Sequence, residues 1–192
     1  LPQVQTIRDL LDSNCICMVV KESELQGALD SLKTPPALVV TDSQAFRKVA
    51  EIVPENIPLT SFSILFARLK GDLRAFIKGA EAIENLKDGD RVLILESCTH
   101  HAIEDDIGRV KIPNLLRKKT GKDLVIENIS GHDFPEISKY ALVIHCGACM
   151  TNRREVLSRI LIAGQKGVPV TNYGIAISYC LGILPRAVKP LI

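Results

Sequence analysis

Two short clusters of thiol and imidazole side chains are the part of this sequence best suited to bind a metal. The first is Cys-Thr-His-His at 98–101, and the second is His-Cys-Gly-Ala-Cys at 145–149. Cys146 and Cys149 are three positions apart, so both sulfurs can be directed at one metal ion or cluster, and the glycine between them allows a tight backbone. Cys98 supplies a third sulfur. One coordination position is then left for a histidine, a carboxylate or an external ligand.

Three interpretations of these cysteines differ in what the thiols hold. Three sulfurs with a histidine suit a structural zinc site, whereas three sulfurs with an uncommitted fourth position suit a [4Fe-4S] cluster that takes part in chemistry. The spacing alone does not separate zinc from iron. Alternatively, thiols at the ends of strands are small buried side chains without a ligand. A third cysteine, with histidines in both clusters, disfavours that last interpretation.

Several neighbouring residues are weaker candidates for the same site. His101 is expected to orient its neighbour or to donate a hydrogen bond to a metal ligand. The acidic run 104–106 offers an oxygen ligand, or else a solvated helix start. Asn172 and Tyr173 follow the last predicted strand, where they form either an ordinary turn and helix cap or part of the cavity around the metal.

The remaining cysteines and one histidine fit structural roles better than chemical ones. Cys15 and Cys17 lie on one face of a predicted strand and are expected in a core or an interface. Cys180 falls in an apolar helix, and His132 follows a glycine in a predicted exposed loop.

The elements that must position the clusters alternate between β-branched runs and helical patterns, which predicts an α/β fold with mainly parallel sheets flanked by helices. Both clusters directly follow predicted strands, so the carboxyl edge of the sheet brings them together. A helix starting at Asn152, with Glu155 completing a capping box, directs its positive end toward the second cluster and favours thiolate. The predicted strands are 15–20, 37–40, 91–96, 124–129, 141–145 and 168–171. The predicted helices are 22–32, a helix that is capped by Thr41-Asp42-Ser43 and runs through residue 52, 72–86, 106–119, 152–164 and 174–181. The segment 59–69 fits both the strand and the helix periods.

The polar turn at 87–90 is the best candidate for a boundary between two domains. It predicts two small domains, 1–86 and 87–192. The first is apolar, with short strands that leave unpaired edges, so it is expected to form a homodimer.

Composition excludes several classes of function. A net charge of +2 and the absence of tryptophan give no basis for binding nucleic acid or an anionic membrane. The longest apolar runs are far shorter than the roughly 20 residues that span a bilayer, and no signal peptide is evident, so the protein is expected to be cytoplasmic. No phosphate-binding glycine motif occurs, and no nucleotide is expected here. Because the chain begins at Leu1, we expect a fragment or a processed chain.

The clusters and several other stretches resemble the HydF family of [FeFe]-hydrogenase maturation factors. The similarity runs in order along nearly the whole chain, which makes it more specific than any single motif. The stretches that carry it are Cys98-x-His100, His145-Cys146-Gly147-Ala148-Cys149-Met150, Val40 to Phe46, Phe62 to Arg68 with Gly71-Asp72, Asp106-Ile107-Gly108-Arg109 and Thr171-Asn172-Tyr173-Gly174.

The resemblance implies a dimerisation domain and a cluster-binding domain without the family's N-terminal GTPase domain. It implies that Cys98, Cys146 and Cys149 hold a [4Fe-4S] cluster, and that the fourth iron has an exchangeable ligand, with His100 and His145 as candidates. A scaffold of this family receives a diiron precursor of the H-cluster and passes it to the apo-hydrogenase. Its partners would be that apo-enzyme and the radical SAM maturases HydE and HydG.

The leading hypothesis is therefore a non-enzymatic assembly scaffold. An iron–sulfur enzyme of the hydro-lyase type is the rival from another class, because an open iron site can bind and activate a substrate. A zinc-stapled structural module is the third possibility.

Overall fold

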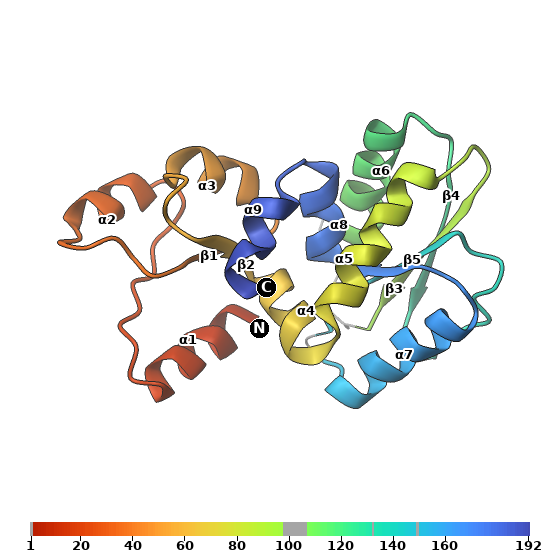
Figure 1. The fold of residues 1–192 in the computed structure, drawn as a ribbon, viewed down its shortest axis with the longest axis horizontal. Coiled ribbons are helices and arrows are strands. Elements are labelled where there is room, and N and C mark those ends of the chain that lie inside the picture. Colours follow the sequence, from red (N-terminus) through yellow and green to blue (C-terminus); the bar gives the residue numbers. More distant parts are fainter. Residues whose placement is uncertain (1, 98–106, 132, 149) are drawn as a thin grey trace.

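The computed structural model is a mixed α/β protein with parallel sheets flanked by helices, as the sequence predicts (Figure 1). A four-stranded sheet with its helices forms one side of the molecule, and a two-stranded sheet with shorter helices forms the other. The structure describes residues 2–97, 107–131, 133–148 and 150–192.

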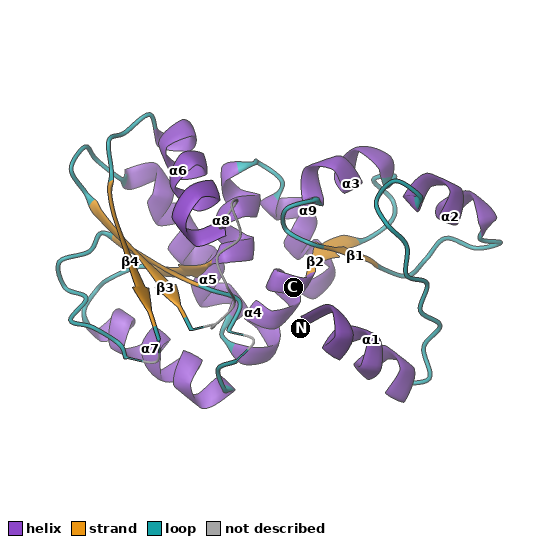
Figure 2. Cartoon of the chain, turned by 180° about the vertical axis from the view of Figure 1, so that it is seen from behind, coloured by secondary structure: helices purple, strands orange, loops and turns teal. Residues whose placement is uncertain are grey.

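The four-stranded sheet is entirely parallel and has the order β4-β3-β5-β6 (Figure 2). Its central strands are continuous apolar runs because helices cover both faces of the sheet. In the register, Leu95 pairs with His145, and His145 pairs with Asn172. The carboxyl ends of β3, β5 and β6 therefore lie side by side at one edge of the sheet. The strands are β3 (Arg91–Glu96), β4 (Val125–Ser130), β5 (Leu142–His145) and β6 (Val170–Asn172).

Helices on opposite sides enclose this sheet. Figure 1 shows α7 below the sheet and α5, α6 and α8 above it. Helix α5 approaches β6 so closely that a Cβ at Gly79 would overlap the carbonyl of Val170, so only glycine fits there. The elements are α5 (Leu73–Glu81) with a 3₁₀ turn (Ala82–Asn85), a π turn (Ile107–Lys111) leading into α6 (Ile112–Thr120), α7 (Arg153–Gln165) and α8 (Tyr173–Cys180).

The smaller side is built on two short parallel strands. Its core receives the C-terminal helix, because Thr60 donates a hydrogen bond from Oγ1 to the carbonyl of Ala187 at 2.7 Å. The chain therefore begins and ends in this half. Its elements are α1 (Pro2–Asp12), α2 (Leu25–Ser31), β1 (Val39–Thr41), α3 (Phe46–Ile52), β2 (Leu59–Ser61), α9 (Leu184–Val188) and a final 3₁₀ turn (Lys189–Leu191).

Helix α4 (Phe62–Lys70) joins the two sides. The segment 59–69, which fits both periods in the sequence, contains strand β2 followed directly by this helix. Ser61 ends the strand and caps the helix, since its Oγ accepts a hydrogen bond from the amide of Ile64 at 3.4 Å.

Two sequence predictions in the first half are wrong. The predicted strand at 15–20 is not formed: the segment has no regular secondary structure, because no strand of the described residues pairs with it. Thr41-Asp42-Ser43 does not cap a helix: the amide of Ala45 closes a turn on the carbonyl of Asp42 at 3.1 Å, and α3 begins after Ala45 without a side-chain cap. The hydroxyl of Ser43 contacts that of Ser61 at 3.3 Å instead.

Helix α5 belongs by its packing to the four-stranded sheet, although it precedes the turn at 87–90. The division into 1–86 and 87–192 stays a prediction about folding units. Among the described residues, no helix combines the length and hydropathy that a membrane span would need.

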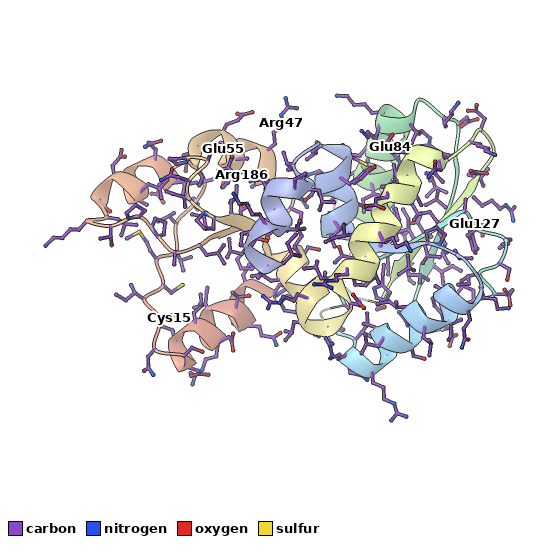
Figure 3. All side chains as sticks on the ribbon, in the orientation of Figure 1. Cys15, Arg47, Glu55, Glu84, Glu127 and Arg186 are labelled. Carbon is purple, nitrogen blue, oxygen red and sulfur yellow. The ribbon has the colours of Figure 1, made fainter. Side chains whose placement is uncertain are left out.

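The unpaired segment 15–20 generates a prediction about self-association. Ile16 is fully exposed and Val19 is 68% exposed, and Figure 3 shows Cys15 at the outer side of this half. Burying such a segment against a second copy removes apolar surface from water. We expect light scattering at micromolar concentration to give an oligomer for the parent chain and a smaller mass for the Ile16→Lys/Val19→Lys variant.

The matched control is Leu161→Lys, which places one lysine on an exposed apolar position of α7. This variant should keep the parent's association at the first half. A monomeric mass for the parent, or an unchanged mass for the double variant, would contradict the prediction.

Candidate functional site

The carboxyl edge of the four-stranded sheet brings together the described residues that border both cysteine clusters. Ser97 follows β3, Cys146 follows β5, and Asn172 ends β6. The expected site residues Cys98, His100, His101 and Cys149 lie outside the described residues, as do the acidic run 104–106 and His132.

Cys146 is buried and held by the strand next to its own. Its amide donates to the carbonyl of Leu95 at 2.9 Å, and its Sγ accepts a hydrogen bond from the amide of Ser97 at 3.2 Å. An amide directed at sulfur stabilises the thiolate, which is the form that binds metal. Because Ser97 immediately precedes Cys98, this contact brings the backbone that leads to the first cluster against the sulfur of the second. The donor set fits a thiolate-bound metal.

His145 is buried, and both of its ring nitrogens have partners. Nε2 lies 2.7 Å from the guanidinium of Arg159, and Nδ1 lies 2.8 Å from the carbonyl of Cys146. A guanidinium only donates, so Nε2 accepts, and Nδ1 carries the proton that it donates to the carbonyl. For either nitrogen to bind iron, His145 would have to give up one of these two partners.

Arg159 is the buried cation behind the cysteine loop. It is only 3% exposed, and it also donates to Ser97 Oγ at 2.9 Å and to Glu155 Oε1 at 2.6 Å. A buried charge is tolerated only when it is paired and hydrogen-bonded, and here Glu155, one turn earlier on α7, supplies the opposite charge. The network ties β3, β5 and α7 together next to Cys146.

The loop between β5 and α7 contains one backbone position of high energy. Ala148 has a φ of +56°, in the left-handed region that residues with a Cβ rarely adopt. The glycine that the sequence places between the cysteines, Gly147, does not have a positive φ, and a Cβ there would lie 4.0 Å from the hydroxyl of Ser63. The predicted cap of α7 is confirmed, because Asn152 Oδ1 accepts from the amide of Glu155 at 2.9 Å.

Asn172 and Tyr173 have defined partners at the same edge. Asn172 caps α8 by accepting from the amide of Ile175 at 2.9 Å, and its Nδ2 donates to the carbonyl of Ser63 on α4 at 3.0 Å. The phenol of Tyr173 donates to Glu96 Oε1 at 3.4 Å. Asn172 thus acts as a helix cap and as a link between the two halves, while Tyr173 borders the end of β3.

The other described cysteines lie away from this edge. Burial raises the pKa of the Cys180 thiol to about 12, so at neutral pH it stays protonated and is a poor metal ligand. Cys15 is exposed and Cys17 half-buried, both in the unpaired segment 15–20. Within the described part of the chain, no three His, Cys, Asp or Glu side chains gather as a metal site.

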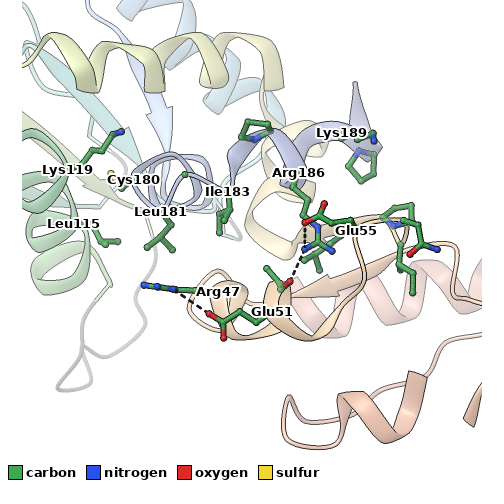
Figure 4. A pocket seen from close by; sticks show the side chains of 18 of the residues that line it. Arg47, Glu51, Glu55, Leu115, Lys119, Cys180, Leu181, Ile183, Arg186 and Lys189 are labelled. Atoms are coloured by element: carbon green, nitrogen blue, oxygen red, sulfur yellow. Dashed lines mark hydrogen bonds and ion pairs between the residues drawn. The ribbon is translucent and has the colours of Figure 1, made fainter. Parts of the chain in front are cut away.

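A pocket of about 1130 Å³ lies between α3 of the first half and helices α6, α8 and α9 (Figure 4). Apolar side chains such as Ile183 line its floor, and charged side chains such as Arg47 and Lys119 stand around it. Arg186 bridges its wall by donating to the carbonyls of Ala50 and Val53. None of the residues that line this pocket belongs to the cysteine loop.

Sequence reasoning missed the positively charged side chains that surround the loop. Arg159 had a detectable signal, because it falls on the buried face of α7 between Val156 and Ala163, where a charge needs a partner. No pattern in the sequence indicates the roles of Lys70 and Arg153. Their partners are backbone carbonyls far away in the sequence.

Two family models match the chain. The model described as "Hydrogen maturase F dimerization domain" matches residues 1–71, and the one described as "Hydrogen maturase F tetramerization domain" matches residues 74–190. The search of curated proteins returned no match.

The Arg159 network generates a prediction about stability. Removing the guanidinium in Arg159→Met leaves His145, Ser97 and Glu155 without their shared donor in a buried place. We expect the free energy of unfolding, measured by denaturant titration of the metal-free protein, to fall by about 3 kcal/mol. Arg154→Met, at an exposed position of the same helix, is the matched control and should change stability by less than about 0.5 kcal/mol. Equal effects of both variants would rule out the proposed importance of the network.

Proposed function

We propose, since this chain belongs to the hydrogen maturase F (HydF) family, that its residues 91–192 carry a [4Fe-4S] cluster that serves in hydrogenase maturation. The proposed ligands are Cys98, Cys146 and Cys149. The role is that of a scaffold that holds and delivers cargo, without catalytic turnover by this chain.

The observation that carries the proposal is the hydrogen bond from the amide of Ser97 to Cys146 Sγ at 3.2 Å. It supports a thiolate at Cys146 and brings the chain leading to Cys98 toward that sulfur. The helix α7, capped by Asn152, adds its positive N-terminal end to the same loop. A cluster bound by three thiolates carries negative charge, which these donors and the helix end would stabilise.

The fourth iron position would be served by an exchangeable ligand. His145 is engaged with Arg159 and the carbonyl of Cys146, so its use requires a change of partner. His100 and His101 are the other candidates. When bound, the cluster would supply an iron with a replaceable ligand, through which a diiron precursor can be held and released.

The partners follow from the family. The dimerisation and tetramerisation domains support an oligomer of this chain. The proposed donors of the cargo are the radical SAM maturases HydE and HydG, and the proposed acceptor is the apo-form of [FeFe]-hydrogenase.

The first test concerns the cluster itself. After anaerobic reconstitution, we expect about four irons and four sulfides per chain and an EPR signal on reduction. Cys146→Ala should lose most of both. Cys180→Ala is the matched control and should keep them, because that thiol stays protonated. Zinc in place of iron, or full cluster in the Cys146→Ala variant, would contradict the proposal.

The second test concerns transfer. The loaded chain, freed of unbound diiron complex, should activate apo-hydrogenase without GTP, because holding and releasing the cargo requires no phosphoryl cleavage. Hydrogen evolution is the measurement, and added GTP should leave it unchanged. The same chain carrying the cluster but no diiron complex is the control. Failure of the loaded chain to activate, where a longer HydF protein loaded equally succeeds, would show that another domain is essential.

A further inference from the structure

The cysteine loop receives a cation from outside its own half of the molecule. Lys70, the last residue of α4, donates from Nζ to the carbonyl of Ala148 at 2.8 Å and to the carbonyl of Thr151 at 2.9 Å. The ammonium also lies 5.5 Å from the centre of the Phe66 ring, one turn earlier on the same helix. Two donors of one ammonium therefore hold the two ends of a single short turn.

That turn includes a residue with an unfavourable backbone conformation. The amide of Thr151 closes it on the carbonyl of Ala148 at 3.1 Å, so this carbonyl accepts two hydrogen bonds. Ala148 holds the left-handed φ of +56° and is buried. Such a conformation persists only where its surroundings hold it in place. Lys70 is a charged donor that does so.

The position of Lys70 is fixed independently of the loop. Arg153, at the first position of α7, donates to the carbonyls of Leu69 at 2.6 Å and Gly71 at 3.1 Å, and more distantly to that of Arg68. These contacts satisfy the end of α4, whose carbonyls have no partners within the helix. The junction between α4 and α7 would thus remain when the ammonium of Lys70 is removed.

We infer that Lys70 is a positioning residue of the cluster site, contributed by the first half of the chain to the loop of the second. This inference rests on the proposed function. The ammonium holds the carbonyls of Ala148 and Thr151, which lie on either side of the expected ligand Cys149 in the sequence. It also places a positive charge beside a loop that would hold an anionic group, so it favours the reduced form, which carries one more negative charge.

The experiment compares Lys70→Met, Lys70→Arg and Arg68→Met in the full chain after anaerobic reconstitution. Methionine keeps an unbranched stem over Phe66 but removes the charge and the donors. Arginine keeps the positive charge and the hydrogen-bond donors. Arg68 is exposed on the same helix and is the matched control.

For Lys70→Met we expect iron to be lost to a chelator roughly tenfold faster than from the parent, as for other groups that support metal ligands. The reduction potential, followed by EPR during a redox titration, should become more negative. Lys70→Arg should restore most of the retention and the potential, and Arg68→Met should match the parent. The circular dichroism and the melting temperature of the metal-free variants should stay near those of the parent.

The outcomes separate the two proposals. A parent chain that binds no iron contradicts the proposed function itself. A parent that binds a cluster, with Lys70→Met equal to it in chelation rate and potential, overturns the role of Lys70. The role is also overturned if Lys70→Met and Lys70→Arg lose iron equally while the melting temperature falls, because the effect is then one of general folding.

Discussion

The contact between the end of α4 and the start of α7 depends on two cations, Lys70 and Arg153, which donate hydrogen bonds to backbone carbonyls across it. The last turn of α4 leaves carbonyls without partners, and Arg153 at the start of α7 donates to them. In return Lys70, at the end of α4, donates to the turn that precedes α7. Both cations lie at the negative end of the α4 dipole, where positive charge is favourable. The placement of the cysteine loop against the first half depends on this exchange.

The parallel sheet supplies the other constraint, which is the convergence of strand ends. The register that pairs Leu95 with His145 is what allows the amide of Ser97 to reach Cys146 Sγ. A shift by one residue would turn the side chains to the opposite face and break this contact. Arg159 secures the arrangement from behind, since one guanidinium contacts groups that follow β3 and end β5.

The helices and strands of the second half were predicted well from the sequence, because local sequence signals and burial agree there. The apolar run at 91–96 is β3, and Asn152 caps α7 as its spacing with Glu155 predicts. The elements of the first half were harder to predict. The apolar run at 15–20 is a sound strand signal, but a strand also needs a neighbour, and the described residues provide none there. The contacts of Lys70 with the loop join residues 78 and 81 positions apart, which no local pattern encodes.

Contacts with the described residues around the cysteine loop therefore come from both halves of the chain. The two family models meet between residues 71 and 74, directly after Lys70. Helix α4, on the dimerisation side of that division, reaches the loop at one end through Lys70. At its other end it reaches the first turn of α8 through Ser63, whose Oγ accepts from the amide of Gly174 at 3.1 Å. A Cβ at Gly174 would overlap the Ser63 side chain, so the approach is as close as the backbone permits. Any displacement of α4 would break contacts at both ends together, so this helix couples the cysteine loop to the start of α8.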